Sequence, residues 1–455
     1  MSSIKNKNHL YEEDRPRFVI IGVGGSGCNT IYRMYQEAND FFKFDTINHG
    51  GDNKNLHHGV KILGLNTDQQ SLKSISNGTY IETIQLGLDG LGAGSNPENG
   101  RIAAEHNAAE IQATIEDADI VIIVAGFGGG TGTGAAPFIA ELAKKMGKLV
   151  LGFITKPFFF EGIKKLQTAQ NGLKLFVAKA DTTIVLSNQL LFSVTNSNTS
   201  LSDAYLMIDK VSIELVKSLV RMLKFADLMN LDFADFKKAT QNPEEGGLGV
   251  VGFGEATGVE CGKRAVEMAL SVPLFEPINT DNTKTELHGA SHILIHIVSE
   301  GAPITLSALE GIVTSLTKGT HKEVSIKVGV TVLENSNNKQ NDSFLNITEP
   351  SEQKIKIVFI ATGFKNNIAE DNNLRYTNKY ETTTETHHVD LQQEFKIDDN
   401  TSFLTNRTNI NMQEETNKNS KEMEKEQIDH KEQKNNKKSG YRSLLDVIKT
   451  RFNVH

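Results

Sequence analysis

The chain has 455 residues, of which 48 are Lys or Arg and 56 are Asp or Glu, so its net charge is −8. That length allows two or three domains with a sizeable core, and the acidic balance argues against direct binding of nucleic acid over the whole surface. Two distant cysteines, no signal segment at the N-terminus and no apolar run of transmembrane length argue against a disulfide framework, secretion and a membrane span, so we expect a soluble cytoplasmic protein.

The first half of the chain alternates short apolar runs with helical patterns. Almost purely apolar strands are typical of a parallel sheet that is covered on both faces. Their alternation with helices therefore predicts a doubly wound α/β domain. The predicted strands are 17–24, 60–66, 119–126, 149–155 and 182–188, and the predicted helices are 29–37, 100–116 and 136–146.

A long amphipathic helix is predicted at 203–225, because Ile208, Val211, Leu215, Leu219 and Met222 recur at spacings of three and four. The segment that follows has partly alternating strand patterns around a helical stretch at 305–317. These patterns predict a second, smaller α+β domain. The predicted strands of that domain are 293–300, 325–333 and 354–363.

The composition beyond Gly363 shifts to Asn, Lys, Glu, Thr and Gln, which predicts a disordered linker. The last residues recover an apolar spacing at Leu444, Leu445, Ile448 and Phe452, which favours a docking peptide over a frayed tail. The expected organisation is a flexible N-terminus (1–16), a ligand-binding domain (17–202), a central helix (203–229), an α+β domain (230–363), a linker (364–438) and an interaction peptide (439–455).

Three glycine-rich segments lie between a strand and a helix: GVGGSGCN (22–29), GLGAGSNPENGR (90–101) and GFGGGTGTG (126–134). Each alone is explained by a tight strand–helix connection. Together they would lie at the carboxyl edge of one sheet, where ligands bind in such folds. Glycines let backbone N–H groups converge on an anion at a helix N-terminus. We therefore predict a polyphosphate site, with these glycines serving the backbone rather than core packing.

The stretch GGGTGTGAAP (128–137) resembles the signature loop of the tubulin/FtsZ superfamily. The resemblance runs in order through NTDQQ (66–70), TKPFFFEG (155–162), NLDFAD (230–235) and ATGF (361–364). It implies a Rossmann-like GTPase domain that binds GTP or GDP with Mg²⁺. It also implies a head-to-tail homopolymer that forms the division ring at midcell, beneath the membrane. Membrane-tethering adaptors would bind its C-terminal peptide.

The resemblance implies a role for each part of the nucleotide site. Glu161 would bond the ribose, Tyr205 would stack on the guanine, and Asn188 would lie on the base side. Lys165 stands where the family usually has an Arg near the phosphates. No protein metal ligand is expected. The phosphates would be held by Gly24, Gly25, Ser26, Gly27, Cys28, Asn29, Ala93, Gly94, Gly128, Gly129, Gly130, Thr131, Gly132 and Thr133.

The guanine contact departs from the family pattern. Lys210 occupies the position of the guanine-recognising aspartate, and Asp209 precedes it. A lysine has no acceptor for the guanine N1 and N2 hydrogens. One helical step turns a side chain by about 100°, so Asp209 is no simple replacement. The sequence therefore predicts phosphate binding, while the guanine contact lacks its usual acceptor.

The NLDFAD segment alone is explained by a helix cap, since Asn and Asp favour helix starts. The resemblance implies instead that it meets the nucleotide of the next subunit. Asp232 and Asp235 would then position the attacking water, with Asn230 beside them. Phosphoryl transfer needs mainly an aligned water and charge stabilisation, so hydrolysis would depend on assembly.

Three alternatives remain open. A specialised filament for DNA segregation or cell shape fits the departure at Lys210 and the lack of the family's usual Ile-Pro-x-Phe-Leu peptide. A nicotinamide dehydrogenase is suggested by GVGGSGCN with Asp68 after the second strand. A non-hydrolysing scaffold would keep the fold without turnover.

Overall fold

The computed structural model describes residues 15–37 and 60–364, except for 78, 194, 196–197, 225–227, 230, 242–246, 272–286, 288, 319, 321–322 and 334–352. Residues 1–14 and 38–59, Asn230, and the predicted linker and C-terminal peptide beyond Phe364 lie outside the described residues. Among the helices that the structure describes, none combines the length and hydropathy needed to cross a bilayer.

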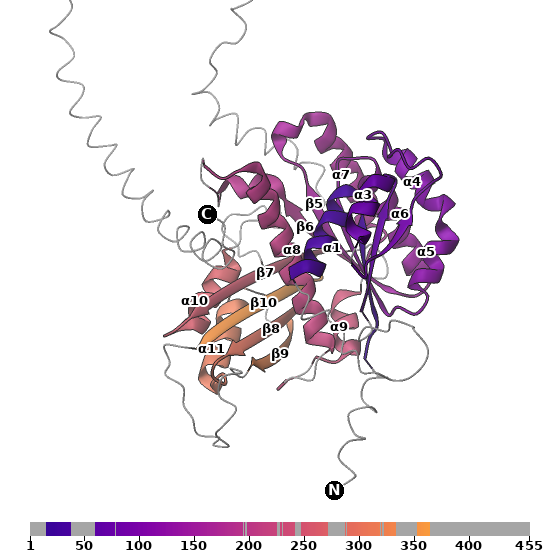
Figure 1. Cartoon of the computed structure of the whole chain (residues 1–455). Helices are drawn as coiled ribbons and strands as arrows, with labels where there is room; N and C mark the ends of the chain where they lie inside the picture. Colours follow the sequence, from indigo (N-terminus) through magenta and orange to yellow (C-terminus); the bar gives the residue numbers. More distant parts are fainter. Residues whose placement is uncertain are drawn as a thin grey trace, which may run out of the picture. The chain divides into compact units, whose positions relative to one another are not determined.

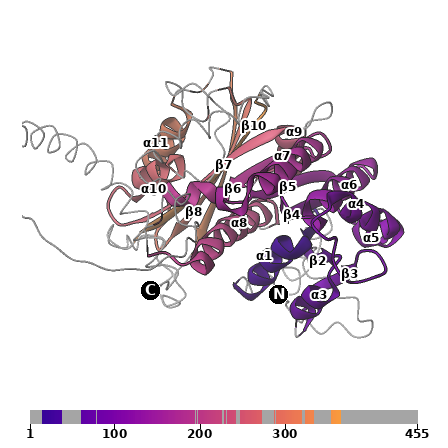
Figure 2. The ribbon, with the colours of Figure 1, turned by 90° about the horizontal axis from the view of Figure 1, so that it is seen from above.

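Ten strands of the described residues follow one another in the order β3-β2-β1-β4-β5-β6-β7-β10-β8-β9 (Figures 1 and 2). From β3 to β7 every neighbouring pair is parallel, so the predicted doubly wound domain is confirmed. The strands are β1 (Phe18–Val23), β2 (Val60–Asn66), β3 (Glu82–Gln85), β4 (Ile120–Gly126), β5 (Leu149–Lys156), β6 (Thr182–Ser187), β7 (Leu248–Thr257), β8 (His292–Glu300), β9 (Ser325–Leu333) and β10 (Lys354–Thr362).

Helices lie between most of these strands. They are α1 (Gly24–Glu37), α3 (Gln69–Ser76), α4 (Pro97–His106), α5 (Ala108–Ile115), α6 (Thr131–Lys145), α7 (Ile163–Val177), α8 (Leu201–Lys224), α9 (Phe233–Thr240), α10 (Cys261–Leu270) and α11 (Leu306–Thr317), with short 3₁₀ helices at Phe159–Glu161 and Asn188–Ser193.

Two predicted helix boundaries were wrong. The helices predicted at 29–37 and 136–146 begin five residues earlier, so the glycine segments already form the first turns of α1 and α6. The helix predicted at 100–116 is divided at Asn107, whose φ and ψ of −95° and 16° leave the helical region. The Asn107 side chain accepts a hydrogen bond from Gly87 N at 2.9 Å, which favours the break.

Strand β7 connects the two halves of the sheet. It pairs in parallel with β6 at Thr183↔Leu248 and antiparallel with β10 along most of its length. Glycines interrupt its apolar pattern, and the sequence did not predict it. A Cβ at Gly254 would lie 1.9 Å from the Ala265 carbonyl oxygen, so this glycine allows α10 to pack directly on the strand. Figure 1 shows α10 and α11 beside this part of the sheet.

Helix α8 contacts both α1 and β7 (Figure 2). In its middle, Glu214 forms ion pairs with Lys217 and with Lys356 of β10. Burial alone would raise the pKa of Glu214, but the two lysines lower it to about 2. The carboxylate therefore stays charged and ties α8 to the second half of the sheet.

Candidate functional site

A cavity of about 540 Å³ lies where β1, β4, β5 and β6 end. This is the carboxyl edge of the parallel sheet, as the glycine segments predicted, and the volume is in the range of ligand sites. The cavity is lined by Gly24, Gly25, Ser26, Asn29, Arg33, Gly126, Phe127, Gly129, Gly130, Thr131, Gly132, Thr155, Lys156, Pro157, Glu161, Lys165, Asn188, Tyr205, Ile208 and Asp209.

The N-termini of α1 and α6 meet at this cavity. A Cβ at Gly24, which has a φ of +71°, would lie 2.9 Å from Gly132 N, so the two glycine segments are in direct contact. The first N–H groups of a helix have no partner within the helix and carry its partial positive charge. Two such ends at one cavity can bind a run of phosphates.

The glycines of 128–137 also serve close packing, and the expectation that they serve the backbone alone was wrong. A Cβ at Gly134 would lie 1.8 Å from the Pro97 carbonyl oxygen, and one at Gly132 would lie 2.4 Å from that of Gly126. At Gly129 no atom lies within 4 Å of the added Cβ. Gly129 therefore leaves the cavity wall open, while Gly132 and Gly134 let α6 approach β4 and α4.

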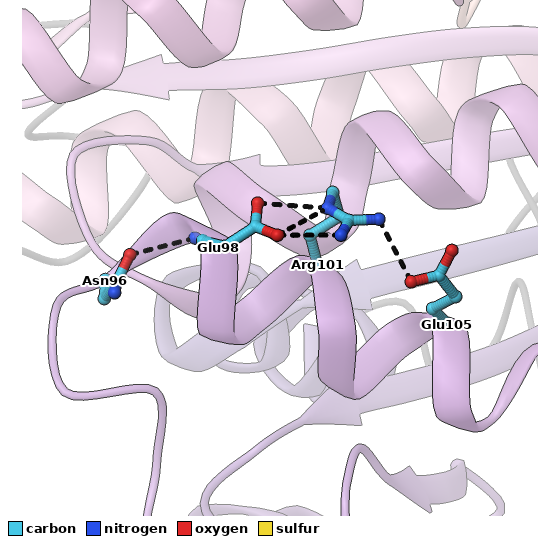
Figure 3. Close-up of polar contacts among 4 residues, drawn as sticks. All are labelled: Asn96, Glu98, Arg101 and Glu105. Carbon is cyan, nitrogen blue, oxygen red and sulfur yellow. Dashed lines mark hydrogen bonds and ion pairs between the residues drawn. The ribbon is translucent and has the colours of Figure 1, made fainter.

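The segment 90–101 packs against the glycine segment 126–134 on the side away from the cavity. Ala93 and Gly94 do not line the cavity, but a Cβ at Gly130 would meet that of Ala93 at 2.7 Å. Asn96 caps α4 by accepting a hydrogen bond from Glu98 N at 3.0 Å (Figure 3). In the same view, the Arg101 guanidinium bridges two carboxylates of α4, Glu98 at 2.7 Å and Glu105 at 3.0 Å.

Several predicted phosphate residues hold the loops without lining the cavity. Thr133 Oγ1 accepts a hydrogen bond from Gly128 N at 2.9 Å and closes the turn. A Cβ at Gly27 would lie 2.2 Å from the Val124 carbonyl oxygen. The Cys28 thiol is buried, and burial raises its pKa to about 12. The thiol therefore stays protonated, which argues against a nucleophile.

Thr131, which lines the cavity, is anchored to the neighbouring strand. Its Oγ1 lies 2.6 Å from Thr67 Oγ1, in the loop that follows β2. The next residue, Asp68, caps α3 and accepts hydrogen bonds from Gln70 N and Ser71 Oγ. In the dehydrogenase alternative, Asp68 would bind the ribose of the cofactor. Asp68 does not line the cavity, which argues against that alternative.

Asn188 and Tyr205, which were predicted to contact the base of the nucleotide, line this cavity as well. The Tyr205 ring packs edge-on against Phe158, with centroids 5.6 Å apart. Asn188 is 7% exposed, and its buried Oδ1 has no hydrogen-bond partner within the described part of the chain. An unsatisfied buried acceptor costs about 1–3 kcal/mol. A ligand with N–H groups on its edge, as guanine has, fits this acceptor.

Glu161 and Lys165 form an ion pair at the cavity. Glu161 Oε1 also accepts a hydrogen bond from Phe158 N at 2.8 Å. The Gln189 side chain accepts one from Phe159 N at 3.0 Å. The loop between β5 and α7 is therefore held by two side-chain contacts, with Lys165 near the glycine segment.

Asp209 lines the cavity and Lys210 does not. The Asp209 carboxylate accepts a hydrogen bond from Thr30 and pairs with Arg33. Lys210 is 7% exposed, and burial lowers its pKa. The sequence analysis did not include Arg33 among the site residues. The signal was its spacing of four from Asn29, which places both side chains on one face of α1.

The described part of the NLDFAD segment (231–235), called the acidic loop below, lies apart from the cavity. Asp232 caps α9 by accepting from Ala234 N at 3.2 Å, and Asp235 pairs with Lys327 at 2.8 Å. Neither lines the cavity. Helix α8 separates the cavity from the acidic loop. It carries Tyr205 at the cavity and ends at Lys224, before the loop. At about 1.5 Å per residue, the helix rises about 28 Å between these two residues. One chain therefore does not bring its acidic loop to its own cavity.

The chain is similar to known proteins along most of its length. Residues 17–196 match the Tubulin/FtsZ family, GTPase domain, and residues 247–342 match the FtsZ family, C-terminal domain. A "Cell division protein FtsZ" of Buchnera aphidicola subsp. Baizongia pistaciae is 34% identical over 371 residues, covering 81% of this chain and 83% of the relative. "Cell division protein FtsZ 1" of Methanocaldococcus jannaschii is 34% identical over 72% of this chain and 81% of the relative. A solved structure described as an empty FtsZ dimer of M. jannaschii has a TM-score of 0.63 and 32% identity, covering 79% of this chain and 92% of the other.

Proposed function

The chain belongs to the FtsZ family of tubulin-like GTPases, and from this premise we propose that it assembles head to tail into filaments of the cell-division ring. The relatives named above are cell division proteins, and one solved neighbour is a dimer. We further propose that each GTP is hydrolysed between two subunits.

The observation that supports a shared site is the separation of the cavity from the acidic loop along α8. The cavity supplies backbone amides and cations but, among its lining residues, only Glu161 and Asp209 as carboxylates. Both are already engaged, with Lys165 and Arg33 respectively. A head-to-tail neighbour would bring Asp232 and Asp235 to the open side of the bound nucleotide.

Binding would use the helix ends for the phosphates, with Arg33, Lys156 and Lys165 offsetting their charge. Mg²⁺ would bind mainly to phosphate oxygens and water, as it usually does in nucleotide sites. Asn188 Oδ1 and Asp209 would accept from the guanine edge, and Tyr205 would pack on its ring.

Hydrolysis would proceed by attack of a water on the terminal phosphorus. The bond from that phosphorus to the bridging oxygen breaks, and GDP and phosphate are the products. The neighbour's Asp235 would orient the water and accept its proton. Asp232 and Asn230 would help to align that water.

The cellular role extends this proposal. We propose that it acts in the cytoplasm at the division site, which its similarity to cell division proteins supports, and that an adaptor binds residues 439–455. The departure at Lys210 supports a second candidate, a specialised filament for DNA segregation or cell shape. Depletion of the protein in its own cells distinguishes the two: undivided filamentous cells support the division role, and normal division with altered shape or DNA loss supports the other.

A concentration series tests the shared site. Phosphate release from GTP and from ATP is measured against protein concentration, with light scattering in parallel. We expect the rate per subunit with GTP to rise above a critical concentration at which scattering also begins. A rate per subunit that does not depend on concentration would overturn the proposal.

A further inference from the structure

Strand β9 holds the acidic loop by its backbone. It lies at the end of the strand order, paired on one side with β8. On the other side Met229, just before the loop, forms an isolated antiparallel bridge with Val330. The two hydrogen bonds of this bridge measure 3.2 and 3.0 Å. The loop therefore begins at a fixed point on β9.

A side chain of the same strand reaches the loop's second carboxylate. Lys327 Nζ lies 2.8 Å from Asp235 Oδ2, and both side chains are 41% exposed. Residues two apart share a face of a strand, so Lys327 and Gly329 point to the same side. A Cβ at Gly329 would lie 3.5 Å from the Met229 carbonyl oxygen. The face of β9 that carries Lys327 is therefore the face on which the loop rests.

This pair contributes little to folding, because exposed ion pairs are screened by water. The charge of Lys327 matters more when the acidic loop approaches a nucleotide. Asp232 and Asp235 are two like charges that must come close to a triphosphate, and like charges placed together are unfavourable. An ammonium at Asp235 offsets part of that repulsion. Because each carboxylate oxygen has its own lone pairs, Oδ1 can accept from a water while Oδ2 accepts from Lys327.

We propose that Lys327 is a positioning residue for hydrolysis in the neighbouring subunit. It fixes the Asp235 carboxylate and offsets its charge, so that Oδ1 faces the attacking water when two subunits meet. This inference rests on the proposed function, since it assigns Asp235 to the nucleotide of the next molecule. It places the reacting surface on two elements, α9 and β9, that are 92 residues apart at this contact.

The test compares full-length Lys327→Gln, Lys327→Arg and Asp235→Ala, together with the double variant Lys327→Gln/Asp235→Ala. Lys61→Gln is the matched control, because Lys61 pairs with Glu82 at 3.3 Å, is also 41% exposed, and lies on β2, next to the last strand at the other end of the strand order. Three quantities are measured: turnover per assembled subunit, GTP affinity below the critical concentration, and the critical concentration with a slowly hydrolysed GTP analogue.

We expect Lys327→Gln to lower kcat about tenfold, with GTP affinity and critical concentration unchanged within about twofold. Lys327→Arg should restore most of kcat, and Lys61→Gln should match the wild type. The double variant should be no slower than Asp235→Ala, because residues that act as a unit are not additive.

Each other outcome is decisive. A wild-type kcat in Lys327→Gln, with Asp235→Ala inactive, overturns the role of Lys327 and leaves the shared site intact. A raised critical concentration with normal turnover makes Lys327 an assembly contact and also overturns it. An additive loss in the double variant means that Lys327 does not act through Asp235. Full activity in Asp235→Ala would instead remove the proposed function itself.

Discussion

The cavity and the acidic loop are built on opposite principles. One wall of the cavity is glycine backbone at the starts of α1 and α6, and close contacts behind it, such as Gly134 against Pro97, hold α6 in place. The acidic loop depends on side chains: Asp232 caps α9, and Asp235 is a half-exposed carboxylate paired with Lys327. Under the proposed function, a rigid binding site in one molecule would face an exposed reacting group in another.

The difference teaches where each kind of change should act. Substitutions at the cavity should alter nucleotide binding or the stability of the fold, since its residues are packed into the α/β domain. Substitutions at the loop should alter turnover alone if, as proposed, the loop completes the site of a neighbouring subunit. The predictions below test this division.

The largest effect is expected at Asp235. Asp235→Ala should bind GTP and assemble like the wild type but lose turnover by about 100-fold or more, because the water is no longer oriented. Phosphate release, equilibrium GTP binding and sedimentation measure the three properties. The division between the two regions fails if this variant releases phosphate at the wild-type rate, or if it loses GTP binding.

Close packing at Gly134 should make the cavity sensitive to a single methyl group. Gly134→Ala places that methyl 1.8 Å from the Pro97 carbonyl oxygen, so we expect a loss of about 1–3 kcal/mol in the free energy of unfolding. Gly129→Ala is the control, since no atom lies within 4 Å of the added Cβ; its stability should stay within about 0.5 kcal/mol. Denaturant unfolding measures both, and equal losses would contradict the packing argument.

These two glycines also show what the sequence could and could not provide. Their composition and their place between strand and helix predicted an anion site at the sheet edge, and the cavity lies there. The sequence could not show that Gly134 packs against α4, because that contact joins segments brought together only by the fold. The same limit explains the missed strand β7, whose glycines hide its apolar alternation.

Side-chain direction was the other limit. The resemblance aligned Lys210 with the guanine contact, while the structure places Asp209 on the cavity and pairs it with Arg33. Which of two adjacent helical residues faces a ligand depends on how α8 lies against α1. The pairing of Lys327 with Asp235 was equally hidden, since it joins β9 to the first turn of α9, 92 residues away. Motif order predicted the parts of the site but not these contacts.

Base selectivity should follow the residue that faces the cavity. Asp209→Asn should lower the preference for GTP over ATP about tenfold, because an acceptor near the guanine edge is weakened and the Arg33 pair is lost. Lys210→Gln is the neighbouring control and should leave the preference within about twofold. Competition binding with both nucleotides measures the ratio. If Lys210→Gln changes the ratio and Asp209→Asn does not, the base lies against the other side of α8.

The smallest effect is expected at Cys28, which separates residues that touch the ligand from those that hold the loop. Its thiol points toward the carbonyl oxygens of Gly22 and Leu65, at 3.5 and 3.7 Å, and burial raises its pKa to about 12. Cys28→Ala should therefore keep its Kd for GTP within about twofold, and a thiol-alkylating reagent should react slowly with the folded protein. Asn29→Ala, one residue further along and on the cavity wall, should weaken binding about tenfold through the loss of a polar ligand contact. Equal Kd values for the two variants would mean that the start of α1 does not contact the nucleotide through its side chains, and that binding there rests on backbone amides alone.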